Sequence, residues 1–182
     1  MNFELVLENL IPEFEKNRIR YALIGGFALG AWGIPRATMD LDFLIHKKDL
    51  NKLDEILTKM GYKLRFRSEN VSQYKSNKKD LGSLDFLHAF REISLKMLAR
   101  AEFKDVRRGK LSIKVARPED IIGLKIQAMA NDPQRKLKEL ADIEAILRLY
   151  KRKINWKLIQ EYFQLFKLED EFKFLMQVLK NA

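Results

Sequence analysis

The stretch from Tyr21 to His46 constrains the fold more than any other part of this 182-residue chain. An apolar run that ends at Ile24 meets a glycine pair, a small-residue segment follows, and a second apolar run carries Asp40 and Asp42. We interpret the stretch as a strand, a glycine turn, a short helix, a loop and a second strand. Because side chains alternate along a strand, we expect Asp40 and Asp42 to share one face, about 7 Å apart.

Two like charges on one strand face disfavour each other's ionised form, and a divalent cation between them removes that cost. Mg²⁺ prefers oxygen ligands and is commonly held by one or two carboxylates together with substrate phosphates. The acid pair therefore favours a magnesium site. The alternative is a turn beside an acidic strand end that faces solvent.

The glycine pair, thirteen further residues and then Asp-Leu-Asp resemble the active-site signature of the nucleotidyltransferase superfamily, which has the DNA polymerase beta-like fold. The resemblance implies that Gly25 and Gly26 turn the chain near the triphosphate of an NTP. It also implies that Asp40 and Asp42 bind two Mg²⁺ ions, with Mn²⁺ as a substitute. A third carboxylate on a neighbouring strand completes the site in that superfamily.

Asp85 is the candidate for this third carboxylate. Residues 83–88 are expected to form a strand that puts this acid between two large apolar side chains, where it needs a partner. By the resemblance, Asp85 helps to bind the metal or deprotonates the attacking hydroxyl. The alternative is an acid at an exposed strand end.

Arg36 and Thr38 precede the acid pair, as Arg-x-Thr does in many members of the superfamily. The resemblance places the guanidinium near phosphates and the hydroxyl near the metal site. The alternatives are a solvated loop arginine and a threonine that starts a strand.

A second resemblance lies in the C-terminal third of the chain. Arg-Pro-Glu-Asp opens a predicted helix with Lys125 in its apolar stretch, and the next helix carries Glu139 and Asp142. The pattern resembles the helical part of abortive-infection toxins of the AbiEii/AbiGii type, which often have Asp where this chain has Glu139. It implies that Lys125 contacts nucleotide phosphate and that Asp142 orients it or positions the acceptor. The alternatives are a lysine that reaches water and a surface acid paired with Lys138.

These elements predict an α+β fold, a mixed β-sheet of nucleotidyltransferase type with flanking helices and a C-terminal helical region. We expect a catalytic core at residues 1–117 and a helical region packed on it at residues 118–182. A hairpin that turns at Arg108-Gly109 ends the core. Pro12 predicts a kink or a split in the first helix.

Composition excludes several classes of protein. The chain has no cysteine, which excludes disulfides and thiolate metal sites. We expect a cytoplasmic protein without a membrane partner, because the start lacks a signal-peptide pattern and the longest uncharged run is too short to cross a bilayer. The net charge of +10 fits either a polyanionic partner or a lysine-rich surface.

The resemblances together imply a Mg²⁺-dependent nucleotidyltransferase. It would move an NMP group from an NTP to a hydroxyl of RNA, protein or a small molecule, and act as a toxin with a cognate antitoxin. Two alternatives stay open. One is a nucleotide- or partner-binding module of the same fold without turnover. The other is a nucleic-acid-binding protein whose binding depends steeply on salt and ignores Mg²⁺.

Overall fold

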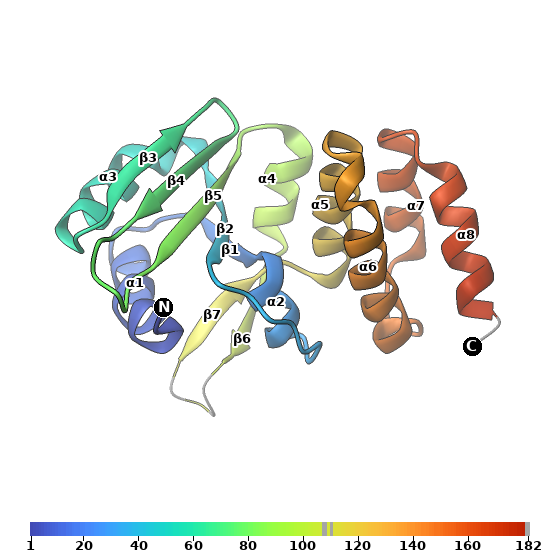
Figure 1. The fold of residues 1–182 in the computed structure, drawn as a ribbon, viewed down its shortest axis with the longest axis horizontal. Helices are drawn as coiled ribbons and strands as arrows, with labels where there is room; N and C mark the ends of the chain where they lie inside the picture. Colours follow the sequence, from blue (N-terminus) through green and yellow to red (C-terminus); the bar gives the residue numbers. More distant parts are fainter. Residues whose placement is uncertain (107–108, 110, 181–182) are drawn as a thin grey trace. The chain divides into compact units, whose positions relative to one another are not determined.

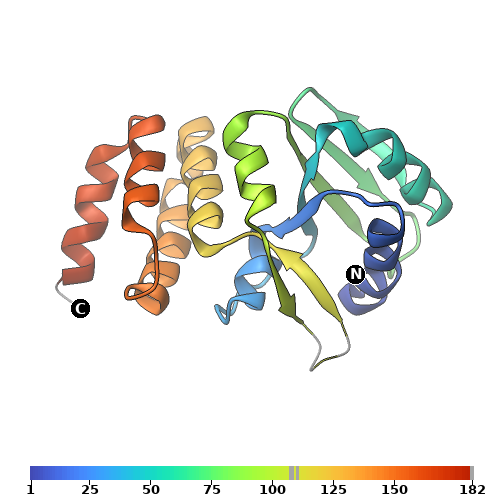
Figure 2. The same ribbon diagram turned by 180° about the vertical axis from the view of Figure 1, so that it is seen from behind.

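The computed structural model describes residues 1–106, 109 and 111–180 and divides the chain into two compact units, Met1–Ala116 and Arg117–Ala182. The first unit is built on a mixed β-sheet, and the elements described in the second unit are helical (Figures 1 and 2). The predicted α+β fold class is confirmed.

Seven strands form one sheet in the first unit. They are β1 (Tyr21–Ile24), β2 (Leu41–His46), β3 (Lys63–Arg67), β4 (Val71–Lys75), β5 (Ser83–Ala89), β6 (Glu102–Asp105) and β7 (Ser112–Val115). Their order across the sheet is β3-β4-β5-β2-β1-β7-β6. β2 runs parallel to β5 and β1 parallel to β7, while the other neighbours are antiparallel. The strands that carry Asp42 and Asp85 are therefore adjacent.

The helices of this unit are α1 (Phe3–Lys16), α2 (Gly25–Ala31), α3 (Leu50–Lys59) and α4 (Glu92–Ala99), with a 3₁₀ turn, η1 (Lys47–Asp49), before α3. α1 and α3 lie against one face of the sheet (Figures 1 and 2). Phe14 of α1 contacts Tyr21 and Phe43 with ring centroids 5.0 and 5.8 Å away, and Phe43 stacks on Phe86 at 5.5 Å. This aromatic row forms the core on one face of the sheet, while Asp42 and Asp85 belong to the opposite face.

The structure corrects two local predictions. α1 continues through Pro12, so the helix is not split there; it buries five apolar side chains, and Pro12 itself is exposed. Asp40 does not lie on β2 but one residue before it, in a bend. The ladder between β1 and β2 ends at the pair Ile24–Asp42, since the chain turns away at Gly25, and Asp40 has no residue of β1 opposite it.

The predicted hairpin after α4 is present as the antiparallel pair of β6 and β7. Its expected turn is Arg108-Gly109, and Arg108 lies outside the described residues.

The second unit contains α5 (Pro118–Asn131), α6 (Lys136–Tyr150), α7 (Trp156–Leu165) and α8 (Glu169–Lys180), with a 3₁₀ turn, η2 (Pro133–Arg135), before α6. Pro118 is the first residue of α5, where its missing N–H costs nothing. α5 and α7 meet at Gly123, where a β-carbon would lie 2.8 Å from the Tyr162 ring, and the Tyr162 hydroxyl donates to Asp120 at 2.8 Å. Each helix in the described part of the chain is too short or too polar to cross a bilayer.

Candidate active site

Two acids lie side by side on the face of the sheet opposite the aromatic core. Asp42 of β2 and Asp85 of β5 are directly paired in the parallel ladder, so their side chains leave the sheet on the same side. Their strand neighbours, including Leu41, Phe43 and Phe86, are buried, whereas both acids are partly exposed. The alternation expected from the sequence is therefore present around both acids, although Leu44, on the face of Asp42, is buried.

Asp40 is held close to this pair by its own loop. The Thr38 hydroxyl lies 3.1 Å from Asp40 Oδ1 and 3.2 Å from the Asp40 carbonyl oxygen. Burial raises the pKa of the Asp85 carboxyl, and the negative charge of Asp40 raises it further. Gln73 opposes this shift, because its Nε2 donates a hydrogen bond to Asp85 Oδ2 at 3.3 Å.

The glycine pair packs directly against these residues. A β-carbon at Gly25 would lie 2.0 Å from Asp42 Oδ2, and the φ of Gly25 is +67°, so both space and backbone require glycine there. A β-carbon at Gly26 would lie 2.9 Å from the Thr38 β-carbon and 3.5 Å from Arg36 Cγ. The first unit thus gathers seven of the predicted site residues, namely Gly25, Gly26, Arg36, Thr38, Asp40, Asp42 and Asp85.

Gln73 belongs to this group and was not predicted. It stands opposite Asp85 in the antiparallel pair of β4 and β5. The sequence shows only a polar residue at an exposed position of a strand. The register between two strands separated by a long turn decides that this amide meets the acid, and nothing in the local pattern gives that register.

The donor set suits a hard divalent cation. Carboxylate oxygens are the ligands that Mg²⁺ and Mn²⁺ take in proteins. Burial raises the pKa of Asp85 and the charge of Asp40 raises it further, and a bound cation would relieve both effects. Among the described residues no three His, Asp or Glu side chains already stand in the arrangement of a metal cluster, so the fit concerns donor chemistry.

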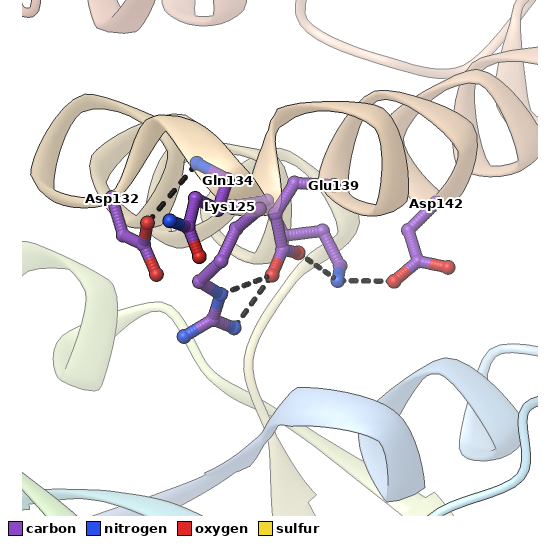
Figure 3. A network of polar contacts seen from close by, with 6 residues as sticks. Lys125, Asp132, Gln134, Glu139 and Asp142 are labelled. Carbon is purple, nitrogen blue, oxygen red and sulfur yellow. Dashed lines mark hydrogen bonds and ion pairs between the residues drawn. The ribbon is translucent and has the colours of Figure 1, made fainter.

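A second group of charged side chains lies within the second unit (Figure 3). Lys125 Nζ of α5 donates to Asp142 Oδ2 at 2.6 Å and to Glu139 Oε2 at 2.8 Å, both on α6. Glu139 and Asp142 are 1% and 6% exposed. The alternative of a surface acid at position 142 is therefore excluded, and Lys125 is an almost buried cation between two carboxylates.

Glu139 is the centre of this network. Its second oxygen, Oε1, accepts from Arg135 at 2.6 and 3.0 Å. Burial opposes the ionisation of Glu139, but the hydrogen bond and charge of Lys125, followed by those of Arg135, outweigh it and lower the pKa. Sequence reasoning missed this role, although the spacing of Arg135 and Glu139 is that of a helical ion pair.

The comparison with protein families decides the class of this chain. A sequence model of the family described as "Uncharacterised nucleotidyltransferase" matches residues 2–181. The chain belongs to this family. The predicted membership of the nucleotidyltransferase superfamily is confirmed, and the protein is an enzyme that transfers nucleotidyl groups. No curated protein sequence matches the chain.

Solved structures share the fold of this nucleotidyltransferase at low identity. ANT(2'')-Ia in complex with adenylyl-2''-tobramycin has a TM-score of 0.68 and 13% identity, and the match covers 92% of this chain and 98% of that one. An antigenic nucleotidyltransferase-like protein from Paracoccidioides brasiliensis has a TM-score of 0.60 and 19% identity, and the match covers 98% of this chain and 92% of that one. A lincomycin-bound lincosamide antibiotic adenylyltransferase has a TM-score of 0.55 and 15% identity, and the match covers 79% of this chain and 95% of that one.

Proposed function

We propose that this nucleotidyltransferase moves an NMP group from an NTP to a hydroxyl acceptor at the site formed by Asp40, Asp42 and Asp85. The observation that carries the proposal is the direct pairing of Asp42 with Asp85 beside Gly25, whose missing side chain leaves room for the Asp42 carboxylate. The nucleotidyltransferase family of the chain supports it.

In this proposal the three carboxylates hold the divalent cations, Mg²⁺ or Mn²⁺. Bound there, such cations would neutralise charge on the triphosphate and lower the pKa of the acceptor hydroxyl. Gly25 and Gly26 let the chain approach the triphosphate closely, and Arg36, beside Gly26, supplies a cation for its oxygens.

The reaction replaces one ester bond by another. The acceptor oxygen bonds to the α-phosphorus, the bond from that phosphorus to the oxygen bridging the α- and β-phosphates breaks, and pyrophosphate leaves. Asp85 is the candidate to take the acceptor proton, because a carboxylate can act as general base for a hydroxyl in the site. Gln73 holds its carboxylate in place.

The test is a labelled-NTP panel. Each of the four NTPs, labelled at the α-phosphate, is incubated with the protein, Mg²⁺ and cell extract, and RNA, protein and small molecules are then separated. We expect label in one fraction with the native protein and none with Asp42→Asn. If no NTP labels any fraction while thermal shift still detects NTP binding, the chain is a binding module and the proposal fails.

A toxin role is a second proposal, carried by the network of the second unit. The ion pair of Lys125 with Asp142 joins the two residues that the toxin resemblance singles out, which supports roles in binding phosphate and in orienting the lysine. The proposal expects growth arrest on induced expression, and no arrest with Asp42→Asn at equal protein level. It expects rescue by a cognate antitoxin. Normal growth with active enzyme would exclude it.

A further inference from the structure

A row of side chains continues from the candidate carboxylates to the edge of the sheet. Asp42 is paired with Asp85, Asp85 with Gln73 and Gln73 with Phe66, so these four residues cross β2, β5, β4 and β3 in register. Directly paired residues project from the same face of a sheet. Phe66 takes this place because the register shifts between Leu64 and Phe66, which removes Arg65 from the ladder.

This face of β3, β4 and β5 is open within the first unit. Gln73 and Lys75 are exposed, whereas Ser72 and Tyr74, which alternate with them, are buried on the side of α3. Phe66 is 50% exposed. Figure 1 shows no helix of the described first unit across this face, and Figure 2 shows α1 and α3 on the other side. The half-exposed Phe66 ring therefore lies on the same open face as Gln73 and Asp85.

The charged residues of β3 and β4, at the Phe66 end of the row, are all basic. Lys63 is paired with Lys75 on the same face as Phe66, and Arg65 stands at the register shift beside it. The sequences of β3 and β4 hold no acid. The remaining cation, Arg67, lies on the other face, where its Nη1 and Nη2 donate to the carboxylate of Asp54 of α3 at 2.9 and 2.7 Å. The open face therefore offers an aromatic ring between the lysine pair Lys63–Lys75 and the acids of the site.

An exposed aromatic ring flanked by lysines is the chemistry that binds single-stranded nucleic acid, because bases stack on the ring and phosphates pair with the cations. Adjacent strands are about 4.8 Å apart, so Phe66 lies roughly 10 Å along the row from Asp85. An acceptor that contacts both must be longer than one nucleotide. A polyamine-like acceptor such as an aminoglycoside carries positive charge itself and would be repelled by Lys63 and Lys75.

We propose that the acceptor is single-stranded RNA, with an unpaired base on Phe66, phosphates on Lys63 and Lys75, and its terminal ribose hydroxyl at Asp85. This inference rests on the proposed function for the transfer step. The ribose oxygen bonds to the α-phosphorus of the NTP, pyrophosphate leaves, and the hydroxyl proton passes to the Asp85 carboxylate.

The test measures RNA binding separately from transfer. A short fluorescently labelled single-stranded RNA of mixed sequence is titrated with the full chain in EDTA, without NTP, and anisotropy gives the Kd. Phe66→Ala is compared with Phe103→Ala, which removes a ring of similar exposure, 58%, from β6 at the other end of the sheet order. Lys75→Glu is compared with Lys52→Glu, which makes the same charge change on α3.

We expect Phe66→Ala to weaken binding about tenfold and Phe103→Ala to leave it unchanged. Lys75→Glu should weaken binding and lower its salt dependence, and Lys52→Glu should do neither. Equal Kd values for each variant and its control overturn the inference, whatever the labelled-NTP panel finds. Label on protein or on a small molecule, with none on RNA, also overturns it. Failure of transfer with RNA binding intact would instead refute the proposed function.

Discussion

At the scale of single residues, the requirement for glycine is strictest at position 25. A side chain there would occupy the position of the Asp42 carboxylate, and the left-handed backbone adds a cost of about 1–2 kcal/mol for any other residue. We expect Gly25→Ala to lower nucleotidyl transfer about 100-fold, because the carboxylate must move by ångströms.

Gly30→Ala is the matched control for this prediction. Both glycines belong to α2, but a β-carbon at Gly30 would meet nothing within 4 Å. Alanine is the better helix former, so this variant should keep its activity and unfold with a free energy higher by about 0.5–1 kcal/mol. Steady-state transfer rates and urea unfolding measure both effects. Equal activity of the two variants would show that the glycine pair is not part of the active site.

Asp85 predicts how stability depends on pH. Its folded-state pKa is raised by burial and by Asp40, so the folded chain binds its proton more tightly than the unfolded chain does. Its contribution to stability is therefore largest at low pH and is lost as the pH rises past the unfolded pKa, near 4, towards the folded value. In EDTA, Asp85→Asn should thus raise the thermal midpoint at pH 7 and leave it unchanged below about pH 4.

At pH 7, Mg²⁺ should reverse the order of the two thermal midpoints, so that the native protein melts above Asp85→Asn. A cation that binds the ionised carboxylates stabilises the native protein and not Asp85→Asn, since it binds the folded state with the full donor set. Differential scanning fluorimetry with and without Mg²⁺ at both pH values measures the two effects. A lower midpoint for Asp85→Asn in EDTA at neutral pH would contradict the raised pKa of Asp85.

The acids themselves could be predicted because their signals are local. Strand alternation predicts that Asp42 points away from the core face of Leu41 and Phe43, and the glycine pair marks the turn beside it. Gln73 and Phe66 could not be predicted, because their meeting with Asp85 depends on strand order and on one register shift that a chain pattern does not contain.

At the scale of elements, the pair α5 and α6 depends on Lys125. Removing this cation leaves the carboxylates of Glu139 and Asp142 buried without their shared partner. Deleting one partner of a buried ion pair lowers the free energy of unfolding by about 3–5 kcal/mol. We expect urea unfolding of Lys125→Met to show a loss of this size. Lys136→Met is the control, because its bond to Glu171 joins α6 to α8 at the surface, where ion pairs contribute about 0–1 kcal/mol.

A triple variant separates structure from binding. Lys125→Met with Glu139→Gln and Asp142→Asn removes all three charges and should regain most of the lost stability. If Lys125 also contacts nucleotide phosphate, this stable variant has a higher KM for the NTP. An unchanged KM together with restored stability would limit the network to holding α5 on α6 and would refute the phosphate contact.

Most elements could be predicted from hydrophobic periodicity, and the errors have physical causes. Pro12 removes one hydrogen bond from α1, but the apolar side of the helix packs on the sheet and outweighs that loss. Asp40 follows strand alternation in sequence, yet the antiparallel partner strand has already ended at Ile24. In both cases tertiary packing decides what the local pattern leaves open.

At the scale of the whole molecule, the candidate metal ligands lie apart from the side chains whose packing folds the chain. The aromatic row of Phe14, Tyr21, Phe43 and Phe86 lies on one face of the sheet, and the carboxylates of Asp42 and Asp85 project from the other. The second unit has its own contacts, such as the close approach of Gly123 and Tyr162. Folding is therefore expected to proceed without metal.

Chelation tests this separation. We expect EDTA to abolish nucleotidyl transfer and to leave the near-UV circular dichroism of the buried aromatic side chains unchanged, because the hydrophobic contacts of the core do not involve the acids. Added Mg²⁺ or Mn²⁺ should restore transfer to the same sample without a refolding phase, since the ligands already project from a formed sheet. A loss of the near-UV signal in EDTA would mean that a metal holds the fold itself, and the carboxylates would then be structural ligands and not the site of reaction.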